Sequence, residues 1–77
     1  MLDVALTVDA KGLSCPMPVI RAKKGIESVA VGEVVEVLST DPGSVADFAA
    51  WTRATGHELV ESRQEGSVFC YRIRRRK

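Results

Sequence analysis

The stretch Gly12-Leu13-Ser14-Cys15-Pro16-Met17-Pro18 joins an alternating apolar segment to a segment with helical periodicity. Because proline disfavours helical geometry in the residue before it, Pro16 predicts an extended Cys15 that caps a helix. Pro16 and Pro18 then fall in the first helical turn, where a missing N–H costs no hydrogen bond. The sequence therefore predicts a strand, a loop, and a helix that begins at Pro16 directly behind a thiol.

This predicted position of Cys15 favours thiol chemistry. Free amides of Cys15 and Met17, together with the helix dipole, attract negative charge to the start of a helix. A thiol there ordinarily has a lowered pKa, and its thiolate is a nucleophile. The alternative is that Cys15 is a small buried apolar side chain and that the prolines only start the helix.

The rest of the chain predicts four strands and two helices in the order βαβαββ. Because strand–helix–strand connections are right-handed, both helices should cover the same sheet face and leave the other open. The segment 34–39 is apolar on both faces apart from Glu36, which indicates an interior strand. The expected elements are residues 4–8, 16–28, 34–39, 44–55, 58–64 and 67–74. We expect one domain over residues 1–77, of the α+β class and with two layers.

Three sets of side chains are expected to form the core, one from each helix and one from the last strand. They are Val19, Ala22, Ile26 and Val29; Val45, Phe48, Ala49 and Thr52; and Phe69, Tyr71 and Ile73. Ser44 and Asp47 have the spacing of a capping box at the start of the second helix, and Gly56 marks the end of that helix.

Composition excludes several classes of function. Two cysteines and one histidine stand far apart, so we expect no metal site, and no glycine-rich phosphate loop indicates a cofactor. No apolar run approaches the roughly 20 residues that span a bilayer. Without an export signal, the cysteines indicate free thiols and a cytoplasmic protein. The last residues are basic: Arg72, Arg74, Arg75, Arg76 and Lys77 hold five of the eleven lysines and arginines.

Three blocks of the sequence resemble the TusA-like (SirA-like) sulfur-carrier family. They are residues 9–18 (DAKGLSCPMP), Asp41-Pro42 followed by Asp47 and Phe48, and residues 56–60 (GHELV). The resemblance implies a mixed four-stranded sheet under two helices. It also implies that Cys15 accepts sulfane sulfur as a persulfide and relays it to another protein.

In such a relay the sulfur donor is a cysteine desulfurase or a rhodanese, and acceptors include DsrE-type proteins. The pathways are tRNA thiolation, molybdenum-cofactor biosynthesis and sulfur oxidation. The resemblance thus implies a sulfurtransferase-type carrier rather than a stand-alone turnover enzyme. We expect a monomer that binds protein partners. We expect it to bind neither a membrane nor, directly, nucleic acid.

Other residues are expected to support Cys15 or to dock partners. Asp9 and Asp41 would orient the Cys15 loop through hydrogen bonds to backbone amides. The supporting set is Asp9, Gly12, Pro16, Pro18, Asp41 and Pro42, and the docking set is Arg21, Lys23, Lys24 and Trp51. For the docking set, a solvated helix face and a tryptophan at the rim of the core remain alternatives.

Three other functions stay open at this point. A non-catalytic adaptor or regulator would use the open sheet face and Trp51. RNA binding would use the arginine-rich end, and its affinity would fall steeply with salt. A dithiol redox protein would pair Cys15 with Cys70, although Cys70 lacks the helix and proline context of Cys15.

Overall fold

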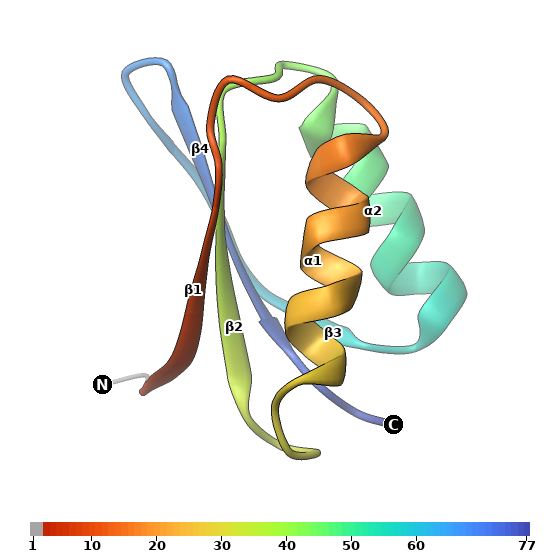
Figure 1. Ribbon diagram of the computed structural model, residues 1–77. Coiled ribbons are helices and arrows are strands. Elements are labelled where there is room, and N and C mark those ends of the chain that lie inside the picture. Colours follow the sequence, from red (N-terminus) through yellow and green to blue (C-terminus); the bar gives the residue numbers. More distant parts are fainter. Residues whose placement is uncertain (1–2) are drawn as a thin grey trace.

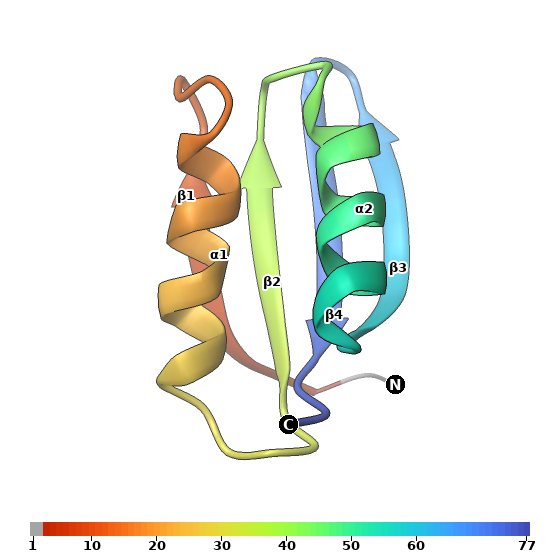
Figure 2. The ribbon, with the colours of Figure 1, turned by 90° about the vertical axis from the view of Figure 1, so that its right-hand side faces the viewer.

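The computed structural model describes residues 3–77 as one sheet layer and one helix layer. In chain order the elements are β1 (Val4–Ala10), α1 (Met17–Glu27), β2 (Val34–Ser39), α2 (Ser44–Thr55), β3 (Glu58–Glu65) and β4 (Val68–Arg74). Both helices lie on one face of the sheet (Figure 1 and Figure 2). The expected α+β sandwich is confirmed, and residues 1 and 2 of the expected domain lie outside the described residues.

The sheet is mixed and has the strand order β1-β2-β4-β3. Strands β1 and β2 are parallel, and β4 runs antiparallel to both β2 and β3. The interior position expected for residues 34–39 is confirmed, because β2 pairs on both sides. Strand β1 continues two residues beyond the expected end, since Asp9 and Ala10 pair with Leu38 and Ser39. The loops that follow β1 and β2 therefore leave the sheet at the same end of its strands (Figure 1).

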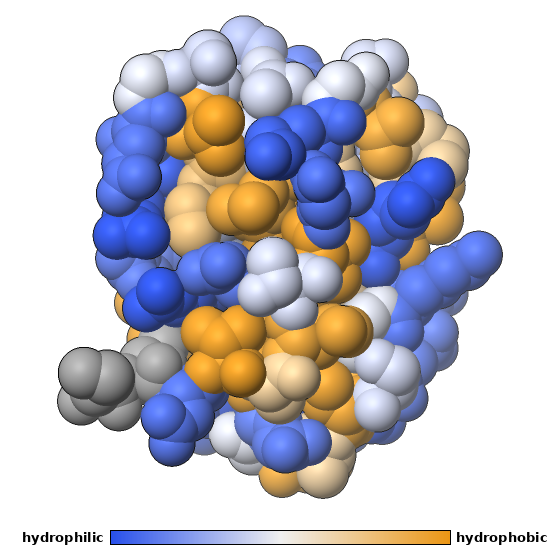
Figure 3. Space-filling model, turned by 60° about the vertical axis from the view of Figure 1, so that its left-hand side comes forward, coloured by the Kyte–Doolittle hydropathy of each residue, from blue (hydrophilic) through white to orange (hydrophobic). Residues whose placement is uncertain are grey.

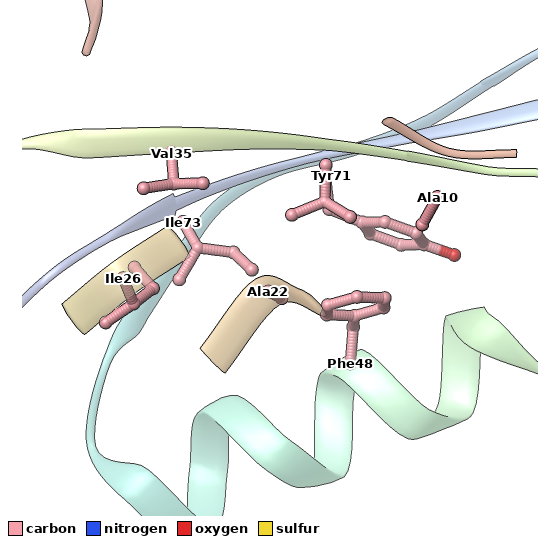
Figure 4. Packing of buried hydrophobic residues seen from close by; sticks show 8 residues of the cluster. Ala10, Ala22, Ile26, Val35, Phe48, Tyr71 and Ile73 are labelled. Carbon is pink, nitrogen blue, oxygen red and sulfur yellow. The ribbon is translucent and has the colours of Figure 1, made fainter. Parts of the chain in front are cut away.

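The core lies between the sheet and the helices, around the stacked rings of Phe48 and Tyr71. Their centroids are 4.5 Å apart with 24° between the ring planes, and both side chains are fully buried. Figure 4 shows Phe48 of α2 facing Tyr71 of β4, with Ala22 of α1 beside Phe48 and Ile26 of α1 on the side of Ile73. The expected inward face of α1 and the expected aromatic face of β4 are confirmed.

The expected inward face of α2 is only partly right. Phe48 and Thr52 are buried, whereas Val45 is 46% exposed. Gly43 caps α2, so Ser44 is the first helical residue and makes no capping bond. The Ser44 hydroxyl instead lies 2.6 Å from the Tyr71 hydroxyl in the interior. A buried tyrosine hydroxyl needs a hydrogen-bonding partner, and this need turns Ser44 inward and Val45 outward.

Gly25 lets α1 approach β1 closely. A Cβ atom built at Gly25 would lie 2.8 Å from Val8 Cγ2 and 3.3 Å from Leu6 Cδ2. Valine methyl groups cannot move away without disturbing the core around them.

Neither described helix is long and apolar enough to cross a membrane.

We expect Gly25→Ala to destabilise the protein. In an open helix this change would stabilise by about 1 kcal/mol, but overpacking against Val8 costs about 1–3 kcal/mol. Urea unfolding should show a free energy of unfolding lowered by up to about 2 kcal/mol, the difference between these terms. The exposed neighbour Lys24→Ala should change it by less than about 0.5 kcal/mol. A stabilised Gly25→Ala variant would contradict the close approach.

Candidate functional site

Cys15 is exposed on the loop between β1 and α1. Pro16, not Cys15, is the N-cap, and α1 begins at Met17. The expected helix start was therefore one residue early. The Met17 amide donates to the Ser14 carbonyl at 2.9 Å, forming a turn that contains Cys15 and Pro16. Pro18, the second helical residue, is fully buried and anchors the first turn of α1.

The Asp41 carboxylate joins the Cys15 loop to the start of α2. Its Oδ2 accepts the Cys15 amide at 3.1 Å, and its Oδ1 accepts the Gly43 amide at 3.2 Å. A second bond between the two loops runs from the Gly12 amide to Thr40 Oγ1 at 2.9 Å. The structure thus places Asp41 against the backbone of Cys15, and it ties Gly12 of the same loop to Thr40.

The other supporting residues act more locally. Asp9 Oδ1 accepts the Lys11 amide at 3.0 Å, so Asp9 orders its own turn and makes no recorded bond to Cys15. Gly12 has φ +82°, a left-handed conformation that favours glycine. Pro42 is exposed in the turn before α2.

Sequence reasoning missed Ser39 and Thr40. Ser39 Oγ accepts a hydrogen bond from the Asp41 amide at 3.1 Å, and Thr40 Oγ1 accepts the bond from the Gly12 amide described above. A run of serine, threonine and aspartate at a strand end before proline is the signal that could have found them.

The pKa of the Cys15 thiol is raised, which contradicts the expected lowering. Hydrogen bonding to Asp47 is the largest cause, followed by desolvation and by the negative charges of Asp47 and Asp41. The amides expected to stabilise a thiolate are already engaged, because Cys15 donates to Asp41 and Met17 donates to Ser14. Two carboxylates thus outweigh the helix start, and Cys15 rests as a neutral thiol.

Asp47 is the residue whose role the sequence misassigned. The predicted capping box would occupy its side chain at the start of α2. Because Ser44 bonds Tyr71 instead, Asp47 in the first turn of α2 is free to face the thiol. No local signal shows this, since it depends on how α2 packs beside α1.

The expected docking residues separate into two groups. Arg21 and Lys24 are exposed on α1, whereas Lys23 and Trp51 line a pocket with residues from the end of the chain. Two apolar side chains close to Cys15 along the chain were not anticipated: Met17 is 38% exposed and Ile20 is 41% exposed. Their spacing of three residues makes them neighbours on the helix surface.

Cys70 lies on the sheet face that carries no helix. It stands between Leu38 and Arg63 on the neighbouring strands and is only 4% exposed. Burial is the largest cause of its raised thiol pKa. Both thiols are free. A buried, protonated thiol on the other face of the sheet gives no support to a dithiol pair with Cys15.

The arginines of β4 are largely neutralised by carboxylates. Arg72 contacts Glu36 at 3.0 Å and Glu61 at 3.3 Å. Arg74 and Arg76 both contact Glu58, at 3.2 and 2.7 Å. The open sheet side shows hydrophilic and apolar side chains intermixed (Figure 3). Tyr71 is buried and unavailable for base stacking, so these findings do not favour RNA binding.

Comparison with known proteins gives the family. A family model described as sulfurtransferase TusA matches residues 6–75. The chain belongs to the TusA family. It is 47% identical over 75 residues to the sulfur carrier protein TusA of Allochromatium vinosum, covering 97% of this chain and 99% of the relative.

Similarity to two further proteins supports the assignment. A putative sulfur carrier protein of Archaeoglobus fulgidus is 48% identical over 60 residues, which cover 78% of this chain and 82% of the relative. The crystal structure of a SirA-like protein from Desulfitobacterium hafniense superposes with a TM-score of 0.79 at 32% identity. That match covers 94% of this chain and 99% of the other.

We expect Asp47→Asn to lower the pKa of Cys15, because it removes the negative charge that holds the proton on the thiol and adds an N–H donor from which a thiolate can accept a hydrogen bond. The pH profile of alkylation at Cys15 by iodoacetamide, followed by mass spectrometry, should shift to lower pH. The rate at pH 7 should rise severalfold. Asp9→Asn is the control and should leave the profile unchanged. A profile for Asp47→Asn that is unchanged or shifted upward would contradict this electrostatic assignment.

Proposed function

We propose that this TusA-family chain is a sulfur carrier that holds sulfane sulfur as a persulfide on Cys15. The observation that carries the proposal is the exposed Cys15, fixed through its backbone amide to Asp41 while its sulfur stays accessible. The relatives named sulfur carrier proteins support the same role. The donor is a cysteine desulfurase or a rhodanese, the acceptor is a protein thiol of the DsrE type, and the setting is the cytoplasm.

Loading is a thiol–persulfide exchange that needs no oxidant. The Cys15 thiol loses its proton to solvent, and the resulting thiolate attacks the outer sulfur of the donor persulfide. A sulfur–sulfur bond forms on Cys15 while the donor's sulfur–sulfur bond breaks. The donor leaves as a thiolate.

Unloading reverses these roles. An acceptor thiolate attacks the outer sulfur of the Cys15 persulfide, and Cys15 leaves as a thiolate that takes up a proton from solvent. Because leaving is slower for a thiol of high pKa, the carboxylates near Cys15 favour retention of sulfur until an acceptor is engaged.

The exposed apolar pair Met17 and Ile20 supplies a docking surface next to the sulfur. Apolar area at the centre of a contact gives binding energy, while charged side chains at its rim steer the encounter. Arg21 and Lys24 on α1 are available as such rim charges. One surface of this kind serves the sulfur donor and the sulfur acceptor in turn, since both proteins need to reach the Cys15 sulfur.

Sulfur loading tests the proposal. The reduced protein is incubated with a cysteine desulfurase and cysteine, and separately with a rhodanese and thiosulfate, and its intact mass is measured. We expect a gain of one sulfur atom that reductant reverses. Cys15→Ser should abolish the gain, and Cys70→Ser should retain it.

Either of two results would contradict the carrier proposal. One is sulfur gain in Cys15→Ser equal to that of the wild type. The other is no gain from both donors, which would favour an adaptor that binds partners without its thiol.

A further inference from the structure

A second site lies at the other end of the helix layer from Cys15. A pocket of about 190 Å³ opens between the C-terminal parts of α1 and α2 and the end of the chain. Cys15 precedes the first turn of α1, whereas most of the residues that line the pocket belong to the last turns of both helices and to the C-terminal segment. These helix ends and the C-terminal segment lie at the same end of the molecule (Figure 1). A ligand there would leave the sulfur uncovered, so this site is separate from the proposed carrier function.

The body of the pocket is largely apolar and is built on the core. Ile26 of α1 and Trp51 and Thr55 of α2 line it. Trp51 is held edge-on against buried Phe48, with ring centroids 6.3 Å apart at 88°, and its other neighbour is the His57 ring at 5.7 Å. The indole is therefore a fixed wall that offers apolar surface to a small molecule.

The rim of the pocket has a surplus of positive charge. Lys23, Arg75 and Lys77 line it together with a single carboxylate, Glu27. Among the ion pairs recorded for residues 3–77, none involves these three cations. The surplus is two positive side-chain charges next to an apolar surface, and this combination suits an anion that has an apolar part.

The end of the chain is a fixed part of this pocket. The Arg75 amide donates to the Glu33 carbonyl at 2.9 Å, and the Gly32 amide donates to the Arg75 carbonyl at 2.7 Å. The Arg75 guanidinium also donates to the Val29 carbonyl at 2.5 Å. Arg75 is thus held at the pocket by the backbone around it and does not belong to a loose tail.

His57 completes the wall as a neutral ring. Its Nδ1 accepts the Arg76 amide at 3.1 Å. Burial, followed by the charges of Arg75 and Lys77, lowers the pKa of His57 below its ordinary value. The neutral imidazole then carries its proton on Nε2, which leaves one N–H donor on that ring.

We propose that this pocket binds a small organic carboxylate, with its apolar or aromatic body against Trp51 and its charge among Lys23, Arg75 and Lys77. The pocket volume is about 190 Å³. A ligand of about ten non-hydrogen atoms fills such a pocket when its charge reaches the rim, and its dissociation constant is expected at about 1–10 mM.

Trp51 is the chain's only tryptophan and reports on the pocket directly. The probe is phenylacetate, titrated into the full chain while indole emission is followed, with phenylacetamide as the uncharged control. We expect a saturable change for phenylacetate and binding about fivefold or more weaker for phenylacetamide. Amide NMR spectra should show shifts at Lys23, Trp51 and Lys77 that saturate with the same constant, and no shift at Cys15.

Charge-removal variants test the rim. The double variant Lys23→Gln/Lys77→Gln should weaken phenylacetate binding about fivefold or more, whereas Lys24→Gln, on α1 outside the pocket, should bind like the wild type. Far-ultraviolet circular dichroism checks that the variants are folded. If the double variant is unfolded, the NMR titration of the wild type alone tests whether phenylacetate binds at the pocket. Three results would overturn the proposal. The first is no saturable change in indole emission up to about 20 mM phenylacetate. The others are phenylacetamide binding as tight as that of phenylacetate, and a loss of phenylacetate affinity in Lys24→Gln equal to that in the double variant.

Discussion

The site depends on the hydrogen bond between the Cys15 amide and the Asp41 carboxylate. Two loops leave the sheet at the same end of its strands because β1 and β2 are parallel, and nothing in the sheet itself fixes one loop against the other. Asp41 does so by accepting the amide of Cys15 with one oxygen and the amide of Gly43 with the other. The start of α2 is thereby tied to Cys15, two residues before α1, and the backbone that carries the thiol is held in place. A charged acceptor makes each of these bonds stronger than a neutral one.

Holding the cysteine through its backbone has an electrostatic consequence. The amide that would have stabilised a thiolate is used by Asp41, and Asp47 adds a second carboxylate beside the sulfur. The site is therefore arranged for position and access, and the thiol is kept protonated. A carrier differs here from a hydrolytic cysteine enzyme, which needs a standing thiolate: reactivity at rest would expose the sulfur to oxidants and wrong acceptors.

Much of the fold follows from local pattern, whereas the finer geometry of the site does not. The apolar periodicity of α1 and the two-faced apolar character of β2 predict their places, and the glycine–proline block predicts a cysteine before a helix. The roles of Ser44 and Asp47 could not be read in this way, because the hydroxyl of Tyr71, 27 residues away, takes Ser44. Likewise, the sequence shows that the end of the chain is basic but not which carboxylates face it. Strand pairing brings Glu36 and Glu58 to its arginines, and only Arg75 and Lys77 remain for the pocket beside Trp51.

The central claim is that Asp41 positions the Cys15 sulfur for exchange. The most direct measurement is the initial rate at which the protein gains sulfur from a donor persulfide, by intact mass, in Asp41→Ala beside Asp9→Ala. Asp9 orders only its own turn, so its variant should load like the wild type. Asp41→Ala should load about tenfold more slowly or worse, because small displacements of a reacting atom are costly. A folded Asp41→Ala variant that loads as fast as the wild type would contradict the account.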